Sequence, residues 1–206
     1  MAATMVNIAD LLPSVLIHVP TCARPVAIHH IRLAAAEFLS GTTIWRETFT
    51  QTIEAATFVL DVPENTRAVQ VHRVTYAGFD LEKARAAHIP AGEVPASPPS
   101  HFYQAEVGKL SVYPFTECDL DITVSLTVPK AGAWAQELPD AVISDYGDVI
   151  ADGAAGKLML LPGTDYANPA MAAHLIAQFE AKIGELSARG ATGIARAPLR
   201  VKPSWL

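Results

Sequence analysis

The sequence predicts an α+β protein in which an α-helical bundle, made of two N-terminal and two C-terminal helices, carries an inserted small antiparallel β-sandwich or barrel. Two observations predict this class. Apolar residues recur at helical spacing near both ends of the chain, and they alternate with polar residues in the middle. A chain of 206 residues normally forms one domain. We therefore expect a single domain over residues 1–189, helical over 1–44 and 138–189 and β-rich over 45–129, followed by a basic docking tail at 190–206.

Two helices are expected before residue 44. The first runs from Asp10 to Val19, with Pro13 in its first turn and Pro20 after its end. The second runs from about Arg24 to Leu39, and Gly41 is expected to stop it. Its apolar stripe consists of Ala27, Ile28, Ile31, Ala34, Ala35, Phe38 and Leu39.

The middle of the chain has a period of two. Its clearest strand is Leu120 to Val128, where every second residue is apolar and the intervening residues are Asp121, Thr123, Ser125 and Thr127. Within the strand Arg67 to Tyr76, Val69 and Val71 are expected on one face, and a bulge is expected because Val74 and Tyr76 are displaced by one position. Shorter strands are expected at 45–51, 57–60, 102–105 and 110–113, and one helical turn fits residues 82–88.

Two more helices are expected near the C-terminus. One begins near Pro139 and is stopped by Pro162-Gly163. The other begins at Asn168-Pro169, a suitable N-cap and first-turn pair, and continues to Arg189. Its apolar face consists of Met171, Leu175, Ile176, Phe179, Ile183 and Leu186. The small residues from Gly153 to Gly156 lack the spacing of a phosphate-binding loop, so they predict close packing between helices.

Several short motifs occur in a characteristic order. Trp45-Arg46-Glu47 follows the N-terminal helices, Leu110-Ser111-Val112-Tyr113-Pro114 lies in the β-region, and Leu138-Pro139-Asp140 precedes Asp145-Tyr146. Over about residues 8–189 the chain thereby resembles the head-to-tail adaptor, or connector, proteins of tailed bacteriophages and phage-derived gene-transfer particles.

The resemblance implies a structural virion protein rather than an enzyme, and it implies no cofactor. Twelve copies would form a ring beneath the portal protein at the head–tail junction, prolong the DNA channel, and present a surface to the next neck or tail protein. The chain would be made in the host cytoplasm. The sequence also has no apolar run near the roughly 20 residues that a membrane helix needs, so we expect no membrane partner.

Charge is unevenly distributed along the chain. The formal net charge is −6, but 11 of the 15 basic residues and all 21 acidic residues lie in the first 185 positions. An acidic body disfavours tight binding to nucleic acid, because phosphate contacts supply most of that affinity. DNA is therefore expected to pass the protein without being held. The four remaining basic residues are Arg189, Arg196, Arg200 and Lys202.

The basic tail predicts a segment that docks on an acidic partner surface, although a terminal segment without a role is the alternative. Leu199 and Val201 alternate with Arg200 and Lys202, which is a strand pattern too short to be stable alone. Such a segment can add to the edge of a partner's sheet, with Trp205 as an anchor. Because terminal segments commonly secure adaptor rings, the resemblance implies that these five residues dock on the portal.

Asp145, Asp148 and Asp152 form an acid cluster that shares one side of a helix with Asp140. We expect these three residues to border the DNA channel, although Asp119 and Asp121 of the β-region could do so instead. The simplest interpretation of the cluster is a solvated helix face. An acid/base pair is disfavoured because no histidine, lysine or serine is expected nearby to complete it.

The sequence gives little support for a metal site or for a reactive cysteine. A metal site built from His18, Cys22, His29 and His30 is disfavoured because Pro20 breaks the helix that would align the first two. Cys22 and Cys118 are expected to be isolated thiols. The alternative function is a small-molecule-binding protein or hydrolase whose site is assembled from residues distant in sequence.

Overall fold

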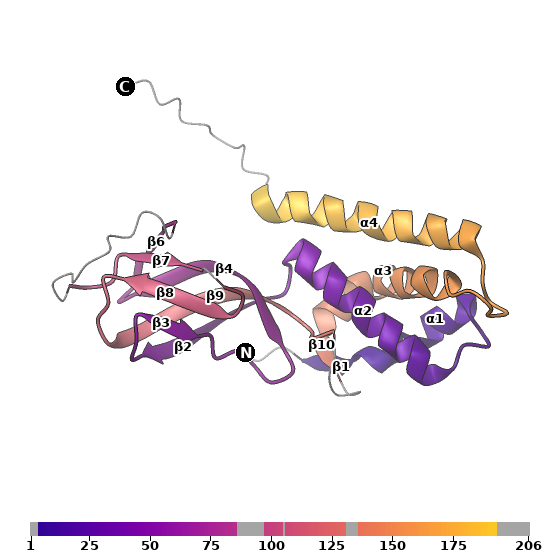
Figure 1. The fold of residues 1–206 in the computed structure, drawn as a ribbon, viewed down its shortest axis with the longest axis horizontal. Coiled ribbons are helices and arrows are strands. Elements are labelled where there is room, and N and C mark those ends of the chain that lie inside the picture. Colours follow the sequence, from indigo (N-terminus) through magenta and orange to yellow (C-terminus); the bar gives the residue numbers. More distant parts are fainter. Residues whose placement is uncertain (1–3, 86–96, 105, 131–135, 193–206) are drawn as a thin grey trace, which may run out of the picture. The chain divides into compact units, whose positions relative to one another are not determined.

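The protein is an α+β chain whose described strands form mainly antiparallel sheets (Figure 1). The computed structural model describes residues 4–85, 97–104, 106–130 and 136–192, with side chains up to residue 188. The chain divides into two compact units. The helical unit comprises residues 1–44 and 133–206, and the β unit comprises residues 45–132.

The helical unit begins with a 3-10 helix, η1 (Ile8–Leu11), which leads into α1 (Leu12–His18). The expected helix from Asp10 to Val19 therefore starts earlier and changes its hydrogen-bonding pattern at Leu12. Asn7 initiates η1, because its Oδ1 accepts a 2.8 Å hydrogen bond from the backbone N–H of Ala9.

Helix α2 (Arg24–Thr42) is longer than expected, because Gly41 does not stop it. A Cβ at Gly41 would lie 2.6 Å from Cγ2 of Ile183, so this glycine permits close packing of α2 against α4 (Pro169–Thr192). The helix ends one residue later, where Thr43 adopts a left-handed conformation with φ of 52° and donates its N–H to the carbonyl of Leu39.

Helix α3 (Asp140–Met159) packs closely against α4, as the small residues predict. A Cβ at Gly153 would lie 2.6 Å from Cδ2 of Phe179, and one at Gly156 would lie 2.9 Å from Cγ1 of Ile176. The predicted N-cap of α4 is confirmed, because Asn168 Oδ1 accepts a 3.1 Å hydrogen bond from Met171 N–H. Together with α2, these helices bury the core of the unit.

A two-stranded sheet that the sequence did not predict joins the start of the chain to α3. β1 (Met5–Asn7) pairs antiparallel with β10 (Glu137–Pro139). The pairing continues beyond the strands, since Ile8 N–H donates to the Gln136 carbonyl and Asp140 N–H donates to the Thr4 carbonyl. The segment before η1 is thereby held against the residues that begin α3.

The β unit contains two four-stranded sheets within the described residues. One has the order β2 (Arg46–Ile53), β9 (Cys118–Thr127), β4 (Arg67–Tyr76), β5 (Phe79–Asp80). The other has the order β3 (Thr57–Val59), β8 (Lys109–Tyr113), β7 (His101–Tyr103), β6 (Glu82–Lys83). β6 is a strand rather than the start of a helical turn, because Glu82 and Ala84 donate their N–H groups to the carbonyls of Ser100 and Phe102. It pairs parallel with β7, which departs from the expected antiparallel pattern.

The two longest predicted strands are present, but the sets of residues that they bury differ from the prediction. In β9 the predicted apolar face, from Leu120 to Val128, is buried, but Ser125 and Thr127 on the other face are buried too. In β4 the predicted bulge is confirmed, and a second register shift accompanies it. Its buried residues are consequently Ala68, Val71 and Val74, spaced by three, so the expected pairing of Val69 with Val71 on one face is wrong.

Candidate functional site

The acid cluster lies along α3 and is less uniform than expected. Asp145 and Asp148 are exposed, whereas Asp152 faces His18 of α1, with 3.3 Å between Asp152 Oδ1 and His18 Nε2. The expectation that no histidine lies near the acids is therefore wrong. Only the packing of α1 against α3, across more than 130 positions of sequence, brings the two side chains together.

The opposite face of α3 anchors these acids in the fold. Ile150, Ala151 and Ala154 are buried there, and a Cβ at Gly147 would lie 2.8 Å from Leu11 Cδ2. The helix is held closely on that side, so its outer face has a fixed orientation in the unit. Whether Asp145 and Asp148 border a channel stays a prediction.

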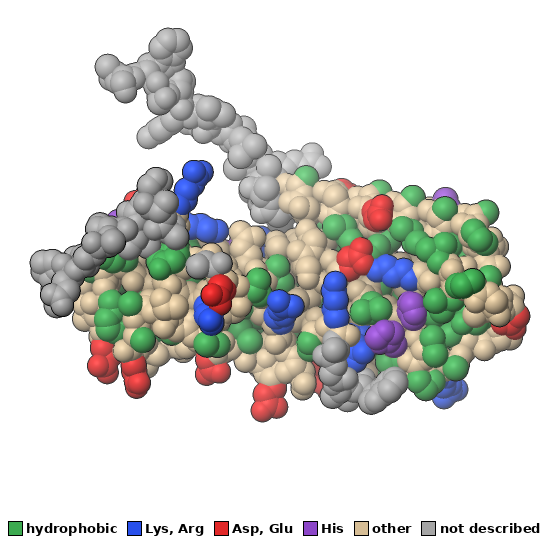
Figure 2. All heavy atoms as spheres, in the orientation of Figure 1, with side chains coloured by type: hydrophobic (Ala, Val, Ile, Leu, Met, Phe, Trp, Pro, Cys, Tyr) green, Lys and Arg blue, Asp and Glu red, His purple; other side chains and the backbone are tan. Residues whose placement is uncertain are grey.

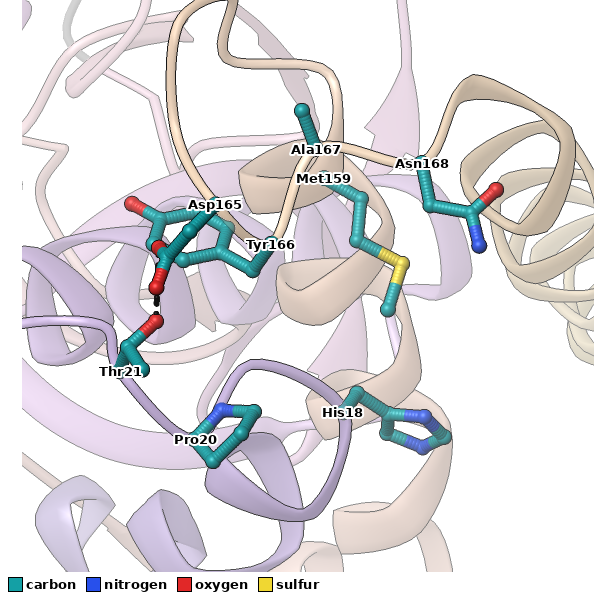
Figure 3. A pocket seen from close by; sticks show the side chains of 8 residues that line it. All are labelled: His18, Pro20, Thr21, Met159, Asp165, Tyr166, Ala167 and Asn168. Atoms are coloured by element: carbon teal, nitrogen blue, oxygen red, sulfur yellow. Dashed lines mark hydrogen bonds between the residues drawn. The ribbon is translucent and has the colours of Figure 1, made fainter.

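The helical unit contains a pocket of about 330 Å³ (Figure 3). The loop between α1 and α2 and the loop between α3 and α4 form most of its wall. The lining includes His18, Pro20, Thr21, Met159, Asp165 and Tyr166. As Figure 3 shows, Thr21 and Asp165 point toward each other, and Thr21 Oγ1 donates a 2.8 Å hydrogen bond to Asp165 Oδ1.

Neighbouring protein groups engage the polar side chains of this pocket. Burial raises the pKa of the Tyr166 hydroxyl, and a hydrogen bond with the Cys22 side chain adds to the increase, so Tyr166 is a neutral phenol near neutral pH. Asn168 uses its Oδ1 to cap α4, and His18 faces Asp152. The contacts of Thr21 with Asp165 and of Cys22 with Tyr166 tie the two loops together. Cys22 is buried, as expected of an isolated thiol, whereas Cys118 is partly exposed.

Histidine and basic side chains gather on one face of the helical unit (Figure 2). On α2, an Arg32 guanidinium nitrogen lies 2.8 Å from His29 Nδ1, and Glu37 pairs with Lys157 of α3. Burial lowers the pKa of His30, and its Coulombic interactions with His29 and Lys157 lower it further. The sequence predicted surface histidines here, but it gave no sign that Lys157 would approach them, because that approach depends on helix packing.

The alternative acids lie on the exposed face of β9. Thr50 Oγ1 and Thr52 Oγ1 of β2 donate 2.6 Å hydrogen bonds to Oδ1 of Asp121 and of Asp119, respectively. The two carboxylates are therefore held in place by the neighbouring strand. Among the residues described, no group of three His, Cys, Asp or Glu side chains is placed to hold a metal ion.

The proposed docking residues Leu199, Arg200, Val201, Lys202 and Trp205 lie outside the described residues, so their role stays a prediction. None of the helices in the described ranges is long and apolar enough to cross a membrane. No protein-family model matches the chain, and no curated protein matches it significantly.

Proposed function

We propose that this chain is a structural head-to-tail adaptor of a tailed phage or phage-derived particle. Twelve copies form a ring on the portal, prolong the DNA channel, and join the head to the next neck or tail protein. One observation carries the proposal: in sequence order, the β unit, residues 45–132, comes after α1 and α2 and before α3 and α4. The resemblance in sequence implies the same order of elements.

The finer architecture that we propose is a helical bundle carrying a small β-sandwich or barrel. Two glutamine side chains support it, because each joins a strand of one sheet to a segment at the other. Gln51 of β2 donates a 2.8 Å hydrogen bond to the Val59 carbonyl of β3 and accepts one from Asp61 N–H. Gln104, which follows β7, accepts a 3.2 Å hydrogen bond from Val71 N–H of β4. Two sheets linked along two sides are typical of a closed or nearly closed arrangement.

In the proposed ring, the outer face of α3 borders the channel. Repeating Asp145 and Asp148 twelve times would line the wall with negative charge, and such a wall repels DNA instead of retaining it. Asp152 contributes less in this proposal, since His18 faces it and is positively charged when protonated. DNA would therefore move through the ring without tight contacts.

Assembly is proposed to depend on the portal, with the basic tail securing the ring. The direct test combines the purified chain with its cognate portal and measures mass by native mass spectrometry, with the chain alone and the portal alone as controls. We expect a monomer for the chain alone at micromolar concentration and a complex of twelve copies on the portal. Stable rings of the isolated chain would contradict portal dependence, and a chain that never binds its portal would overturn the adaptor proposal.

A further inference from the structure

The pocket of the helical unit has room only for a small chemical group. Its volume of about 330 Å³ is close to the lower limit of ligand pockets, which measure about 300–1,000 Å³. The residues that line it come from the end of α1 and the loop after it, and from the end of α3 and the loop before α4. The space therefore suits one long side chain or a ligand of similar size.

One wall of the pocket carries an oriented carboxylate. In Figure 3, Thr21, Asp165 and Tyr166 lie together on one side of the pocket. The 2.8 Å hydrogen bond from Thr21 Oγ1 fixes the direction of the Asp165 carboxylate. A carboxylate can accept about four hydrogen bonds, so this single bond leaves most of its capacity unused. Because Asp165 is exposed, that capacity is open to a ligand.

The charge of the lining favours a cation. None of the lysines or arginines within the described residues lines the pocket. Tyr166 is a neutral phenol near neutral pH and adds no charge, and the histidine of the lining, His18, faces Asp152. Hydrogen bonds from a charged donor to a carboxylate are about twice as strong as those between neutral groups. An ammonium or a guanidinium is therefore the group that best fits this wall.

The remaining wall and the surface beside it are apolar. Pro20 and Met159 line the pocket. Ile17 and Leu160, which adjoin lining residues in the chain, are 79 % and 52 % exposed. A free amine would leave these two side chains in water, whereas a basic side chain carried on a protein surface would bring apolar neighbours that cover them.

We propose that this pocket receives a lysine or arginine side chain from an apolar surface of a partner protein. The charged group binds Asp165, and its methylene stem lies against Pro20 and Met159. Apolar residues of the partner cover Ile17 and Leu160. The inference goes beyond the adaptor proposal, which gives this pocket no role, and it does not depend on it.

Two peptides that differ in charge test the pocket in the full chain. An acetylated and amidated Leu-Arg-Leu peptide carries a basic side chain between apolar neighbours, and the same peptide with citrulline in place of arginine keeps the shape without the charge. Titrations followed by ¹H–¹⁵N NMR should shift the amide signals of Thr21 and Asp165. The arginine peptide should bind at least fivefold more tightly than the citrulline peptide. Equal affinities, or unchanged signals at both residues, would overturn the inference.

Substitution of the acid tests its role. Asp165→Asn keeps the shape of the side chain and removes its charge, so it should weaken binding of the arginine peptide at least fivefold. Glu180→Gln is the matched control, because this exposed acid lies about 18 Å along α4 from Asn168 of the lining, and it should change the affinity less than 1.5-fold. Circular dichroism establishes that both variants are folded. Equal effects of the two substitutions would contradict the proposed site.

A small probe distinguishes a partner's side chain from a free ligand. n-Butylguanidinium has the charged group and a stem but no apolar neighbours, so the arginine peptide should bind at least tenfold more tightly. Leu160→Ser should remove most of that difference while the affinity for n-butylguanidinium stays within twofold. Equal affinities of the unchanged protein for the peptide and for n-butylguanidinium would assign the pocket to a free ligand and overturn the inference of a protein partner.

Discussion

Two glycines in neighbouring parts of the helical unit should respond oppositely to the same substitution. Gly153 of α3 faces the Phe179 ring, three of whose carbons would lie 2.6–2.8 Å from an added Cβ. Phe179 is 1 % exposed, so its ring cannot move aside without disturbing the core. Gly184 of α4 is exposed, and a Cβ there meets nothing within 4 Å. The two positions therefore separate the effect of packing from that of helix propensity.

The expected magnitudes follow from these contacts. Alanine is favoured over glycine within a helix by about 1 kcal/mol, so Gly184→Ala should stabilise the protein by about 0.5–1 kcal/mol. At Gly153 the same gain is opposed by overpacking, which costs about 1–3 kcal/mol and lies toward the upper end here because the contact is with a buried ring. We expect Gly153→Ala to destabilise the protein by about 1–2 kcal/mol.

Thermal unfolding followed by circular dichroism measures both variants under one condition. For a chain of this size, 1 kcal/mol corresponds to about 2–4 °C in Tm. Gly184→Ala should raise Tm by about 2 °C, and Gly153→Ala should lower it by about 3–6 °C. If Gly153→Ala is at least as stable as Gly184→Ala, the close approach of α3 and α4 is wrong.

Three further predictions concern pH, the tail and the channel. The pKa values of His30 and His72 lie below their ordinary value of 6.5 in the folded protein, mainly through burial. The unfolded chain therefore binds more protons than the folded protein, and stability should be lost as pH falls from about 6.5 toward the lower folded pKa values. Between pH 7.5 and pH 5 the urea midpoint of His30→Gln should fall less than that of the unchanged protein. An equal fall in the two proteins would contradict this prediction. Removing residues 191–206 should leave the circular dichroism spectrum and Tm nearly unchanged but weaken portal attachment in a pull-down, whereas unfolding would show that the tail belongs to the core. Changing Asp145, Asp148 and Asp152 to lysine should make assembled rings retain DNA in a salt-sensitive manner and slow its ejection, with assembly nearly normal. Because His18 faces Asp152, changing only Asp145 and Asp148 is the cleaner variant, and unchanged DNA retention would refute the lumen assignment.

Long periodic segments could be predicted from the sequence because their pattern repeats over several turns or pleats. The starts of α3 and α4 and the apolar face of β9 are where periodicity and proline placed them. Short strands could be predicted only in part, since β3, β7 and β8 were expected whereas β1, β10, β5 and β6 were not. β1, β10 and β6 have two or three residues, and each exists because a distant segment supplies its hydrogen-bonding partner, whereas the two residues of β5 turn back to pair with the end of β4.

The candidate sites were predictable only where they depend on one element. Exposure of Asp145 and Asp148 follows from the helical pattern of α3 alone. The pairing of Asp152 with His18 and the approach of Lys157 to Glu37 depend on how separate helices pack, which no local pattern encodes. The role of Gly41 could not be predicted from local sequence either. Glycine often ends a helix, but here its missing side chain lets α2 approach α4 closely.

A cryo-EM reconstruction of the chain bound to its cognate portal tests the adaptor proposal most directly. We expect a closed ring of twelve copies that shares the portal's axis, with Asp145 and Asp148 on the wall of an open channel. A chain that binds off the axis, or a ring whose channel is closed by the β unit, would contradict it.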